Sequence, residues 1–298
     1  MKYILKILKI FNKKFLIKKT GGFWSNYNIK SGENYIIDLS VEEISHFGDN
    51  LFFISAFYGK DCKNFTFLVS KKYYFLWEKF RISNVLTSID IFNPECIYVS
   101  SFETKIINRK ISQRFKKKIT FDFTDVDIDM PLYKKISSFF GVENNSSKPM
   151  FVNYNISEKI KQISKKSFFL FNDIIYSRSF LRKYLSKKLT PLLKEKFDNN
   201  EKIFFIGSNE DLKYKNYHKK ISDLRGKTSF EELIYLIQHE NCKAYIGLDN
   251  GLMHLSLLMN KKSYILFRGK FSKKQSNHHF ECINISMNEN AQKNIQYI

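Results

Sequence analysis

The sequence has few cysteines, and it has no apolar run long enough to cross a membrane. Only 4 of its 298 residues are cysteines, and they form no Cys-x-x-Cys pair. Such sparse cysteine is typical of a reduced, cytoplasmic compartment and argues against a disulfide scaffold. A membrane-spanning helix needs about 20 consecutive apolar residues, and no run approaches that length. The 6 histidines also lack the spacing of a metal site.

Acidic residues are scarce relative to basic ones. The chain has 29 Asp and Glu against 50 Lys and Arg, which gives a formal net charge of +21. A strongly basic protein favours anionic partners, and nucleic acid, an anionic membrane surface and a phosphorylated substrate all qualify. The chain is rich in Lys, Asn, Ile, Phe and Tyr together, as are the products of AT-rich genes. The alternative is therefore that part of the basic charge reflects gene composition and serves no partner. The hydrophobic content of 43% is enough for one or two ordinary domain cores.

The most informative stretch is 244–259. Its apolar run 244–248 predicts a strand, and apolar residues at helical spacing over 252–259 predict a helix. In an α/β protein the turn between them lies where free N–H groups and the helix dipole favour a phosphate. An Asn-Gly turn chosen for its backbone alone is the alternative. The candidate ligand-binding residues are Asp249, Asn250, Gly251 and His254.

A second turn lies near the amino terminus. Residues 35–39 (Tyr-Ile-Ile-Asp-Leu) predict a strand, and Gly48-Asp49 opens an apolar helix after a loop. Taken alone, an aspartate at such a position is commonly a helix cap.

Both turns resemble glycosyltransferase family 9, the bacterial ADP-heptose:lipopolysaccharide heptosyltransferases and their relatives. Residues 249–254 resemble the family's Asp-(Ser/Thr)-Gly-x-x-His turn, and residues 223–233 (Asp-Leu-Arg-Gly-Lys-Thr-Ser-Phe-Glu-Glu-Leu) resemble its Leu-x-Gly-x-Thr-Ser-Leu-x-Glu-Leu helix start. The family's first turn, Ser-x-x-Gly-Asp-x-(Leu/Ile), is matched by Ser45, Gly48, Asp49 and Leu51. The chain departs from the family pattern at Ser55, Asn250 and Lys262.

The resemblance implies an α/β protein of GT-B architecture, in which two Rossmann-like doubly wound domains face each other across a cleft. It implies an inverting, metal-independent sugar transfer with Asp49 as the general base, a role that suits a carboxylate because it can take the proton of the acceptor hydroxyl. By resemblance the donor is a nucleotide-diphosphate sugar, ADP-heptose, and the acceptor is an anionic lipid-linked glycan, the lipopolysaccharide or lipooligosaccharide core. No metal or other cofactor is expected, and the acceptor-binding residues stay unknown. The implied donor-binding residues are Asp249, Asn250, Gly251, His254, Arg178 and Glu210, with Arg182 as a rival to Arg178.

Three parts are expected along the chain. A basic amphipathic segment, 1–30, precedes an acceptor-binding domain, 31–155, and a nucleotide-sugar-binding domain, 156–298. Lysines in the first segment recur at helical spacing against apolar residues, which suits an anionic membrane interface; a helix packed on the protein's own surface is the alternative. The lysines also interrupt any signal-peptide core, so no cleavage is expected. We therefore expect a cytoplasmic protein held peripherally on the cytoplasmic face of the inner membrane.

Other functions stay open. A hexosyltransferase of the same family acting on another surface glycan, a family member that has lost activity, and a basic nucleic-acid-binding protein are the alternatives. The last shows no recognisable motif, so nucleic acid is not an expected partner. The acidic cluster at 122–129 contains the Asp-x-Asp of metal-dependent glycosyltransferases of the other large fold, with a solvated loop as the favoured alternative. A calcium loop is excluded because Met130 stands where glycine is required.

Strands and helices alternate along the rest of the chain, which predicts doubly wound parallel sheets. A polar, basic stretch at 156–166 is expected to connect the domains. The helix after 223–227 is expected to start with a capping box formed by Thr228 and Glu231. Further expected strands are 63–70, 85–91, 96–100, 118–123, 167–171, 201–207, 263–267 and 281–285, and expected helices are 71–80, 131–140, 180–196 and 228–238.

Overall fold

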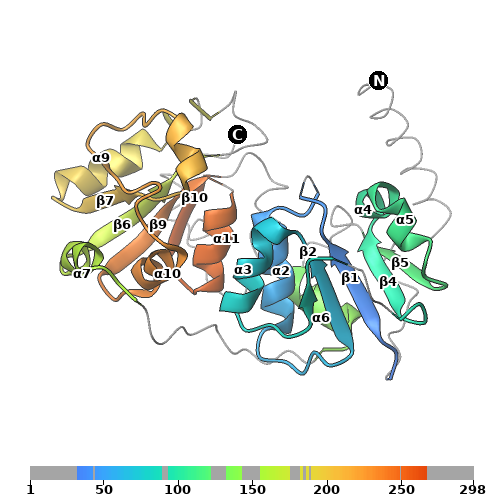
Figure 1. The fold of residues 1–298 in the computed structure, drawn as a ribbon. Helices are drawn as coiled ribbons and strands as arrows, with labels where there is room; N and C mark the ends of the chain where they lie inside the picture. Colours follow the sequence, from blue (N-terminus) through green and yellow to red (C-terminus); the bar gives the residue numbers. More distant parts are fainter. Residues whose placement is uncertain are drawn as a thin grey trace. The chain divides into compact units, whose positions relative to one another are not determined.

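The protein forms two compact units, residues 1–145 and 146–298, in the computed structural model. The structure describes residues 32–42, 44–88, 93–121, 132–142, 155–174, 182–183, 186–187, 189–248 and 250–266. Each unit contains one parallel five-stranded sheet (Figure 1). The division expected from the sequence lies slightly later, between residues 155 and 156. Within the described ranges, no helix is both long enough and apolar enough to cross a membrane.

The first unit has the strand order β3-β2-β1-β4-β5. The chain winds outward from β1 to β3 and then returns to β4 on the other side, which is the order of a Rossmann fold. The strands are β1 (Tyr35–Leu39), β2 (Phe65–Val69), β3 (Val85–Leu86), β4 (Ile97–Ser101) and β5 (Lys118–Phe121). The helices are α2 (Phe47–Phe57), α3 (Lys71–Lys79), α4 (Phe102–Ile107), α5 (Arg109–Ser112) and α6 (Leu132–Phe139).

The core of the first unit is largely aromatic. All five residues of β1 are buried, as expected for a parallel strand covered on both faces. On one face Phe57 of α2 contacts the rings of Phe65 and Phe67, with centroids 5.0 and 4.9 Å apart. On the other face Tyr98 stacks on Phe115 at 5.1 Å. These separations are in the attractive range for ring pairs, so both faces of the sheet are well packed.

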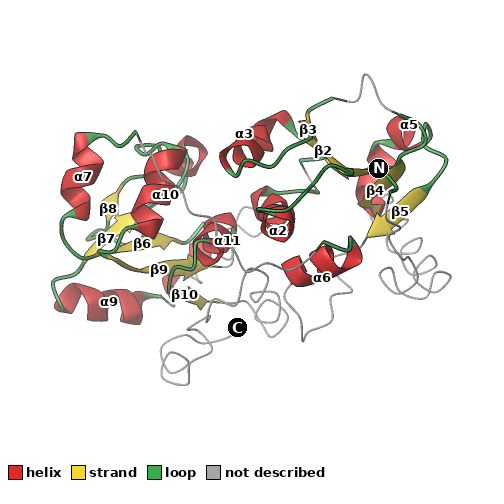
Figure 2. Ribbon diagram, turned by 90° about the horizontal axis from the view of Figure 1, so that it is seen from below, coloured by secondary structure: helices red, strands yellow, loops and turns green. Residues whose placement is uncertain are grey.

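The second unit repeats this plan with the order β10-β9-β6-β7-β8. Its first strand, β6, is again central, and the winding reverses on the side of β9. Figure 2 shows α9 on one side of the sheet and α7 and α10 on the other. The strands are β6 (Phe168–Asn172), β7 (Lys202–Phe205), β8 (Ser222–Asp223), β9 (Cys242–Leu248) and β10 (Ser263–Leu266). The helices are α7 (Glu158–Ser164), α9 (Thr190–Asp198), α10 (Phe230–Gln238), α11 (Gly251–Leu258) and a short 3-10 helix, η3 (Asn209–Lys213).

The prediction that 156–166 is a connection is wrong, because this stretch contains α7. Ile156 and Ile160 lie four residues apart, and they are only 8% and 0% exposed. Ile160 is buried within α7, and Ile156 lies just before its cap, Ser157. The many lysines and polar residues around them leave no apolar stripe in the sequence.

The predicted helix 180–196 is also not continuous. Residues 182–183 and 186–187 are helical, but Leu189 lies in a turn and α9 begins at Thr190. Pro191 explains the new start, because proline is tolerated in the first turn of a helix and breaks its interior.

The other predicted elements agree with the structure to within a few residues wherever it describes them. Strand β3 is the shortest of these, since only Val85 and Leu86 of the expected 85–91 pair with β2. The predicted amphipathic segment 1–30, the acidic cluster 122–129 and the predicted strand 281–285 lie outside the described residues.

Candidate functional site

The carboxyl edge of the second sheet has the geometry of a ligand site. Strand order reverses between β6 and β9, and open α/β sheets bind ligands beyond the carboxyl ends of their strands at such a point. Asn172, the last residue of β6, lies opposite Gly247 in β9. The chain then turns from β9 directly into α11. The amino end of α11 therefore presents its N–H groups at the switch point, as the predicted strand-turn-helix requires.

The Asn250 side chain joins the two loops at this point. Its amide nitrogen donates to Asn172 Oδ1 at 2.9 Å and to the Ile174 carbonyl at 3.1 Å. Its Oδ1 accepts from the Tyr245 hydroxyl at 3.1 Å and from the Met253 N–H at 3.0 Å, so Asn250 also caps α11. A side-chain amide has two donors and two acceptor sites, and all four are used within the protein. Asn250 therefore positions the turn, which differs from the ligand contact expected from the sequence.

Packing requires a glycine at position 247, beside the hydrogen bonds of the Asn250 side chain. The Tyr245 hydroxyl also lies 3.3 Å from the Asn172 carbonyl, so its one proton is shared between that oxygen and Asn250 Oδ1. A Cβ at Gly247 would lie 2.2 Å from that carbonyl oxygen and 2.6 Å from the Tyr245 hydroxyl. Both separations are far inside van der Waals contact, so glycine allows Tyr245, Asn172 and Asn250 to meet. The sequence analysis did not identify Asn172 or Tyr245, because contacts this distant along the chain have no local pattern.

His254 lies one turn into α11 and is only 9% exposed. Burial lowers the pKa of His254 to about 3, so its ring is neutral at physiological pH. A neutral imidazole offers hydrogen bonds and shape to a diphosphate, but no positive charge. Gly251 begins the helix, while Asp249 and Arg178, which the sequence also assigns to the donor, lie outside the described residues.

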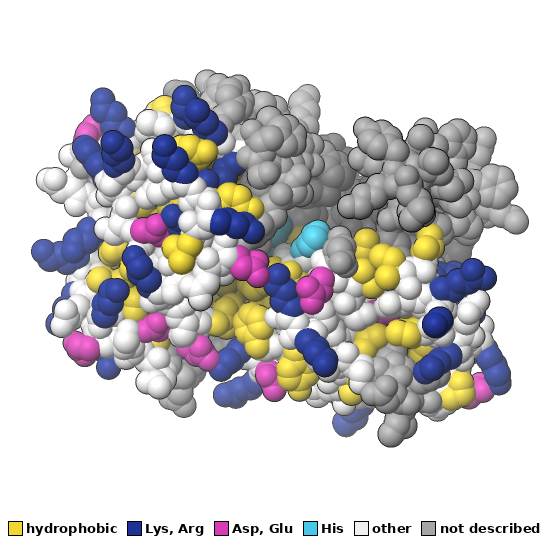
Figure 3. All heavy atoms as spheres, turned by 45° about the horizontal axis from the view of Figure 1, so that its top comes forward, with side chains coloured by type: hydrophobic (Ala, Val, Ile, Leu, Met, Phe, Trp, Pro, Cys, Tyr) yellow, Lys and Arg dark blue, Asp and Glu magenta, His cyan; other side chains and the backbone are white. Residues whose placement is uncertain are grey.

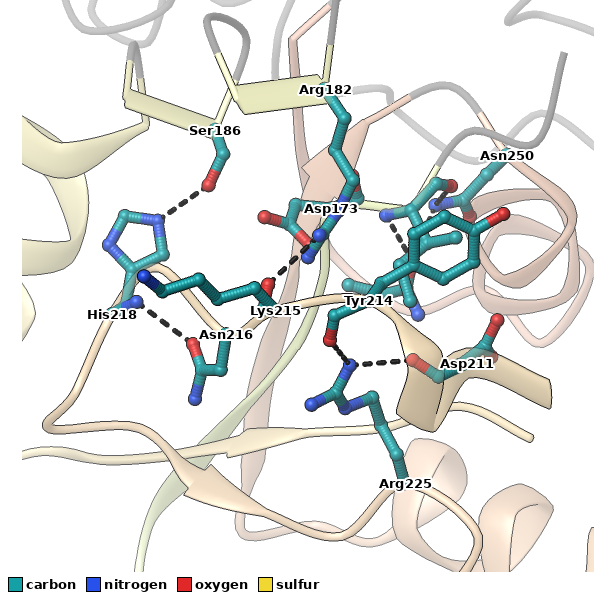
Figure 4. Close-up of polar contacts among 12 residues, drawn as sticks. Asp173, Arg182, Ser186, Asp211, Tyr214, Lys215, Asn216, His218, Arg225 and Asn250 are labelled. Atoms are coloured by element: carbon teal, nitrogen blue, oxygen red, sulfur yellow. Dashed lines mark hydrogen bonds and ion pairs between the residues drawn. The ribbon is translucent and has the colours of Figure 1, made fainter. Parts of the chain in front are cut away.

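A buried ion pair fastens the segment after η3 to the end of β6. Arg182, 2% exposed, donates to the Asp173 carboxylate through both Nη2 and Nε, the latter at 3.1 Å. Its Nη1 donates to the Lys215 carbonyl at 2.9 Å (Figure 4). The Tyr217 ring flanks the guanidinium at 5.1 Å. Arg182, the rival to Arg178 as a phosphate ligand, is thus enclosed by protein groups.

Arg225 fastens the same segment from the other side. Its Nε and Nη2 donate to the two carboxylate oxygens of Asp223 at 2.9 and 2.6 Å. Its Nη1 donates to the carbonyls of Asp211 and Tyr214 at 2.7 and 2.6 Å. Figure 4 shows Arg182 and Arg225 approaching the segment from opposite sides. Because both arginines bind backbone carbonyls, they fix the course of this loop irrespective of its side chains.

Glu210, the predicted ribose contact, lies on η3 and is exposed. The helix begins after Ser208, whose N–H donates to Asp211 Oδ2 at 2.7 Å. Gly207 has φ of 157°, and a Cβ there would lie 2.4 Å from the same Asp211 oxygen. These local constraints hold Glu210 near the carboxyl end of β7, the strand next to β6.

The motif at 223–233 starts α10 one residue later than predicted. The predicted pairing of Thr228 with Glu231 is wrong, because Ser229 is the cap and Glu232 its partner. Ser229 Oγ accepts the Glu232 N–H at 3.1 Å, and Glu232 Oε2 accepts the Ser229 N–H at 2.9 Å. Glu232 Oε1 also accepts the N–H of Ser157 at 3.1 Å. Burial acts to raise the pKa of Glu232, but the hydrogen bonds from Ser157 and Ser229 outweigh it and lower the pKa. One carboxylate thus caps both α7 and α10.

In the first unit, Asp49 lies in the first turn of α2 and is half-buried. Its Oδ2 accepts the His46 N–H at 2.8 Å, so the capping role is present. Desolvation raises the pKa of Asp49 to about 6, against the opposing effects of the His46 hydrogen bond and charge. A carboxylate with such a pKa is ionised at neutral pH and still basic enough to accept a proton. The catalytic role of Asp49 stays a prediction.

Asp38, which the sequence analysis did not identify, is enclosed in β1 with 0% exposure. Its Oδ1 accepts from the Ser40 N–H and hydroxyl at 2.9 and 2.7 Å. Its Oδ2 accepts from Asn108 Nδ2 at 2.8 Å and from the Tyr98 hydroxyl. Because β1 and β4 flank the switch point of the first sheet, this network fixes the start of the loop that leads to Asp49.

A cavity of about 430 Å³ lies at the carboxyl end of β3. It is on the same edge of the first sheet as the Asp49 turn, because all five strands are parallel. In the described part of the chain, no group of three or more His, Cys, Asp or Glu side chains is arranged to hold a metal ion. The cavity is lined by Lys71, Tyr74, Val85, Leu86, Thr87 and Ser88.

Two doubly wound α/β units in one chain, with a helix amino end at the switch point of the second, define the predicted GT-B fold class. The model of glycosyltransferase family 9 (heptosyltransferase) matches residues 182–296, which confirms the family resemblance. The family match and the fold together support a glycosyltransferase.

A solved heptosyltransferase structure has the same class of fold, and two others are similar at lower scores. The E. coli heptosyltransferase WaaC with ADP aligns with a TM-score of 0.51 and 11% identity, covering 83% of this chain and 91% of that chain. E. coli ADP-heptose lps heptosyltransferase II aligns with a TM-score of 0.49 and 14% identity, covering 78% and 84%. A glycosyl transferase family 9 protein from Veillonella parvula has a TM-score of 0.49 and 14% identity, covering 80% and 83%. No curated protein sequence matches this chain.

Proposed function

We propose that this protein is an inverting, metal-independent glycosyltransferase that moves a sugar from a nucleotide-diphosphate donor to a lipopolysaccharide or lipooligosaccharide core. The observation that carries the proposal is the helix amino end at the β6–β9 switch point, inside the segment that matches glycosyltransferase family 9. The similar WaaC structure contains ADP, which makes ADP-heptose the first donor to test.

In the proposed reaction the second unit binds the donor. The N–H groups at the start of α11 and the helix dipole stabilise the diphosphate, whose negative charge grows as the sugar leaves. His254 contributes a neutral ring, and Asn250 holds the turn in place through its bonds to Asn172 and Ile174. Asp249 and Arg178 complete the donor site as predicted from the sequence, and Glu210 contacts the ribose.

In the same reaction Asp49 of the first unit is the general base. It accepts the proton of the acceptor hydroxyl while that oxygen attacks the anomeric carbon and the nucleotide diphosphate leaves from the opposite face. The raised pKa of Asp49, about 6 because of desolvation, matches this task near neutral pH. The cavity beside Lys71 on the same sheet edge is the proposed entry for the acceptor glycan. No cofactor is required by this scheme.

We place the protein in the cytoplasm, in peripheral contact with the inner membrane where a lipid-linked acceptor is found. Its net charge of +21 supports an anionic surface as a partner. On the face shown in Figure 3, lysine and arginine side chains are interspersed with acidic and apolar ones. This mixed distribution favours contacts with a glycan or lipid surface over a single nucleic-acid groove.

The decisive test is the substitution Asp49→Asn. The new side-chain amide keeps an oxygen that can accept the His46 N–H, so the helix cap survives while the base is lost. We expect kcat/KM for sugar transfer to fall about 100-fold or more, with little change in melting temperature. In the unmodified enzyme, kcat/KM should fall as the pH drops through about 6, where Asp49 takes up a proton.

The matched control is Asp61→Asn, which changes an exposed carboxylate that accepts the Lys63 N–H at 3.1 Å. It should transfer sugar at the unmodified rate. Full activity of the Asp49→Asn variant would refute the assigned base. Thermal stabilisation by ADP-, UDP- and GDP-sugars identifies the donor, because a ligand of the folded state raises the melting temperature. If none of them stabilises the protein, an inactive family member becomes the better account.

A further inference from the structure

The helix pair α4–α5 carries two adjacent exposed isoleucines at its junction. Ile106 and Ile107 are 47% and 53% exposed. Single exposed apolar residues are common on soluble proteins, but a neighbouring pair this exposed leaves a continuous apolar spot in water. Leu212, on the second unit, is similarly exposed at 51%, and no other large apolar residue adjoins it in the sequence.

Basic side chains surround this apolar pair. From residue 102 to residue 121 the chain has seven Lys and Arg and one acidic residue, Glu103. Two of the seven are paired with carboxylates from neighbouring segments, Lys116 with Glu95 at 2.5 Å and Lys117 with Glu33 at 2.8 Å. Among the rest, Arg109 and Lys110 are exposed on α5, directly after the isoleucines.

Two further lysines add positive charge to this surface, Lys105 on α4 and Lys118 at the start of β5. Burial lowers the pKa of Lys105, and the positive charge of Lys118 lowers it further, so the two ammonium groups are close enough to repel. Like charges gathered without a described acidic partner are stabilised when an anion binds between them. The α4–α5 surface is therefore defined by Lys105, Ile106, Ile107, Arg109, Lys110 and Lys118.

We propose that the α4–α5 surface docks this unit on an anionic lipid membrane. The isoleucines enter the boundary between headgroups and acyl chains, while the surrounding cations bind lipid phosphates. Nucleic acid fits this surface less well, because single-stranded binders offer aromatic rings for stacking. Among the described side chains of this face, the rings of Tyr98 and Phe115 are stacked on each other and buried.

The position of this surface relative to the Asp49 turn follows from the strands and from Asn108. Lys118 begins β5 and lies opposite Tyr98, near the amino end of β4. The Asp49 turn follows the carboxyl end of β1, which is parallel to β4. Asn108, between Ile107 and Arg109, donates to Asp38 and Ser40 at the carboxyl end of β1. The α4–α5 surface therefore extends from the amino end of β5 towards the sheet edge that carries the Asp49 turn.

The experiment is co-sedimentation of the full-length chain with phosphatidylcholine vesicles, with and without phosphatidylglycerol, in the absence of any sugar donor. One variant, Ile106→Ser with Ile107→Ser, removes the apolar pair, and another, Arg109→Gln with Lys110→Gln, removes two charges. Each should weaken binding to the anionic vesicles by about tenfold or more. Because all four residues are exposed, both variants should keep the unmodified melting temperature.

The matched controls lie on the second unit. Leu212→Ser removes an exposed leucine, and Lys165→Gln with Lys166→Gln removes two adjacent exposed charges. Both should bind vesicles like the unmodified chain. Unchanged binding by the α4–α5 variants would overturn the proposal and assign any affinity to another segment, such as 1–30. Equal binding to both kinds of vesicle, or a tenfold loss of affinity for a single-stranded RNA with no loss for vesicles, would overturn it as well. Because no donor is present, the outcome is independent of whether the protein transfers sugar.

Discussion

Replacing Asn250 by aspartate exchanges one nitrogen for oxygen and keeps the size of the side chain. The new carboxylate can still accept from Tyr245 and Met253, but it can no longer donate to Asn172 Oδ1 or to the Ile174 carbonyl. Two oxygen acceptors, at 2.9 and 3.1 Å in the unmodified protein, would then face a negatively charged oxygen. The substitution therefore isolates the two donated hydrogen bonds from packing.

The cost follows from the hydrogen bonds involved. Two lost bonds contribute about 2 kcal/mol, and leaving acceptors unsatisfied against a carboxylate adds about 1–3 kcal/mol. The negative charge of the new aspartate at the start of α11 stabilises the variant by about 0.5 kcal/mol through the helix dipole. The net loss of unfolding free energy is about 2.5–4.5 kcal/mol, which lowers the melting temperature of a unit this size by roughly 5–18 °C.

Calorimetry of the full-length chain measures this loss, with Asn241→Asp as the matched control. Among the described residues the Asn241 amide donates one side-chain bond, to the Ser164 carbonyl at 2.9 Å, so its replacement should cost about 1 kcal/mol. Protonating the carboxylate introduced by Asn250→Asp restores one donor, and the deficit of this variant should therefore shrink as the pH falls. If the melting temperature of Asn250→Asp at neutral pH is no lower than that of Asn241→Asp, the Asn250 side chain does not hold the two loops together.

Two further predictions concern the same edge of the second sheet. Gly247→Ala should destabilise the protein by about 2–3 kcal/mol through overpacking, because the new Cβ would lie 2.2 Å from the Asn172 oxygen. At Gly141, where φ is 61°, an added Cβ would meet no heavy atom of the described residues within 4 Å. Gly141→Ala should therefore cost only about 1 kcal/mol of backbone strain, as measured by chemical denaturation. Equal losses of unfolding free energy in the two variants would contradict the packing argument. His254, with a pKa of about 3 caused by burial, should stay neutral in NMR spectra down to pH 4. Because the unfolded histidine titrates near 6.5, its burial should reduce stability as the pH falls from about 6.5 towards 3, and a folded-state midpoint near 6.5 would contradict this.

The strands and helices of this protein were predictable where burial left a local pattern. The apolar runs of β1, β6 and β9 and the spacing of α11 are visible in the sequence, because a parallel strand covered on both faces must be apolar throughout. Helix α7 was missed since Ile160, and Ile156 just before its cap, are the buried isoleucines of a stretch otherwise rich in lysines and polar residues. The break before α9 depended on a single residue, Pro191.

The candidate site was predictable only as a set of turns. The Asp-Asn-Gly turn and the Gly-Asp helix start have local signatures, and the structure places Asn250, Gly251 and Asp49 at strand-to-helix turns as expected. The partners that hold them were not predictable. Asn172 is 78 residues from Asn250, and the sequence offers no reason to pair those two amides among its many asparagines. The same holds for Arg225, whose bonds to backbone carbonyls place no demand on the identity of the residues bound.

The departure from the family pattern at Asn250 has a physical consequence for function. A serine or threonine at this position has one donor and can cap α11, but it is too short to donate to two acceptors on the β6 loop as the amide does. In this chain the amide ties the β9 turn to the β6 loop and also caps α11 through the Met253 N–H. The substitution thus changes how the predicted phosphate-binding turn is held and keeps the helix start at Gly251. An asparagine at this position is therefore no evidence of lost activity, and the question of activity rests instead on the carboxylate of Asp49.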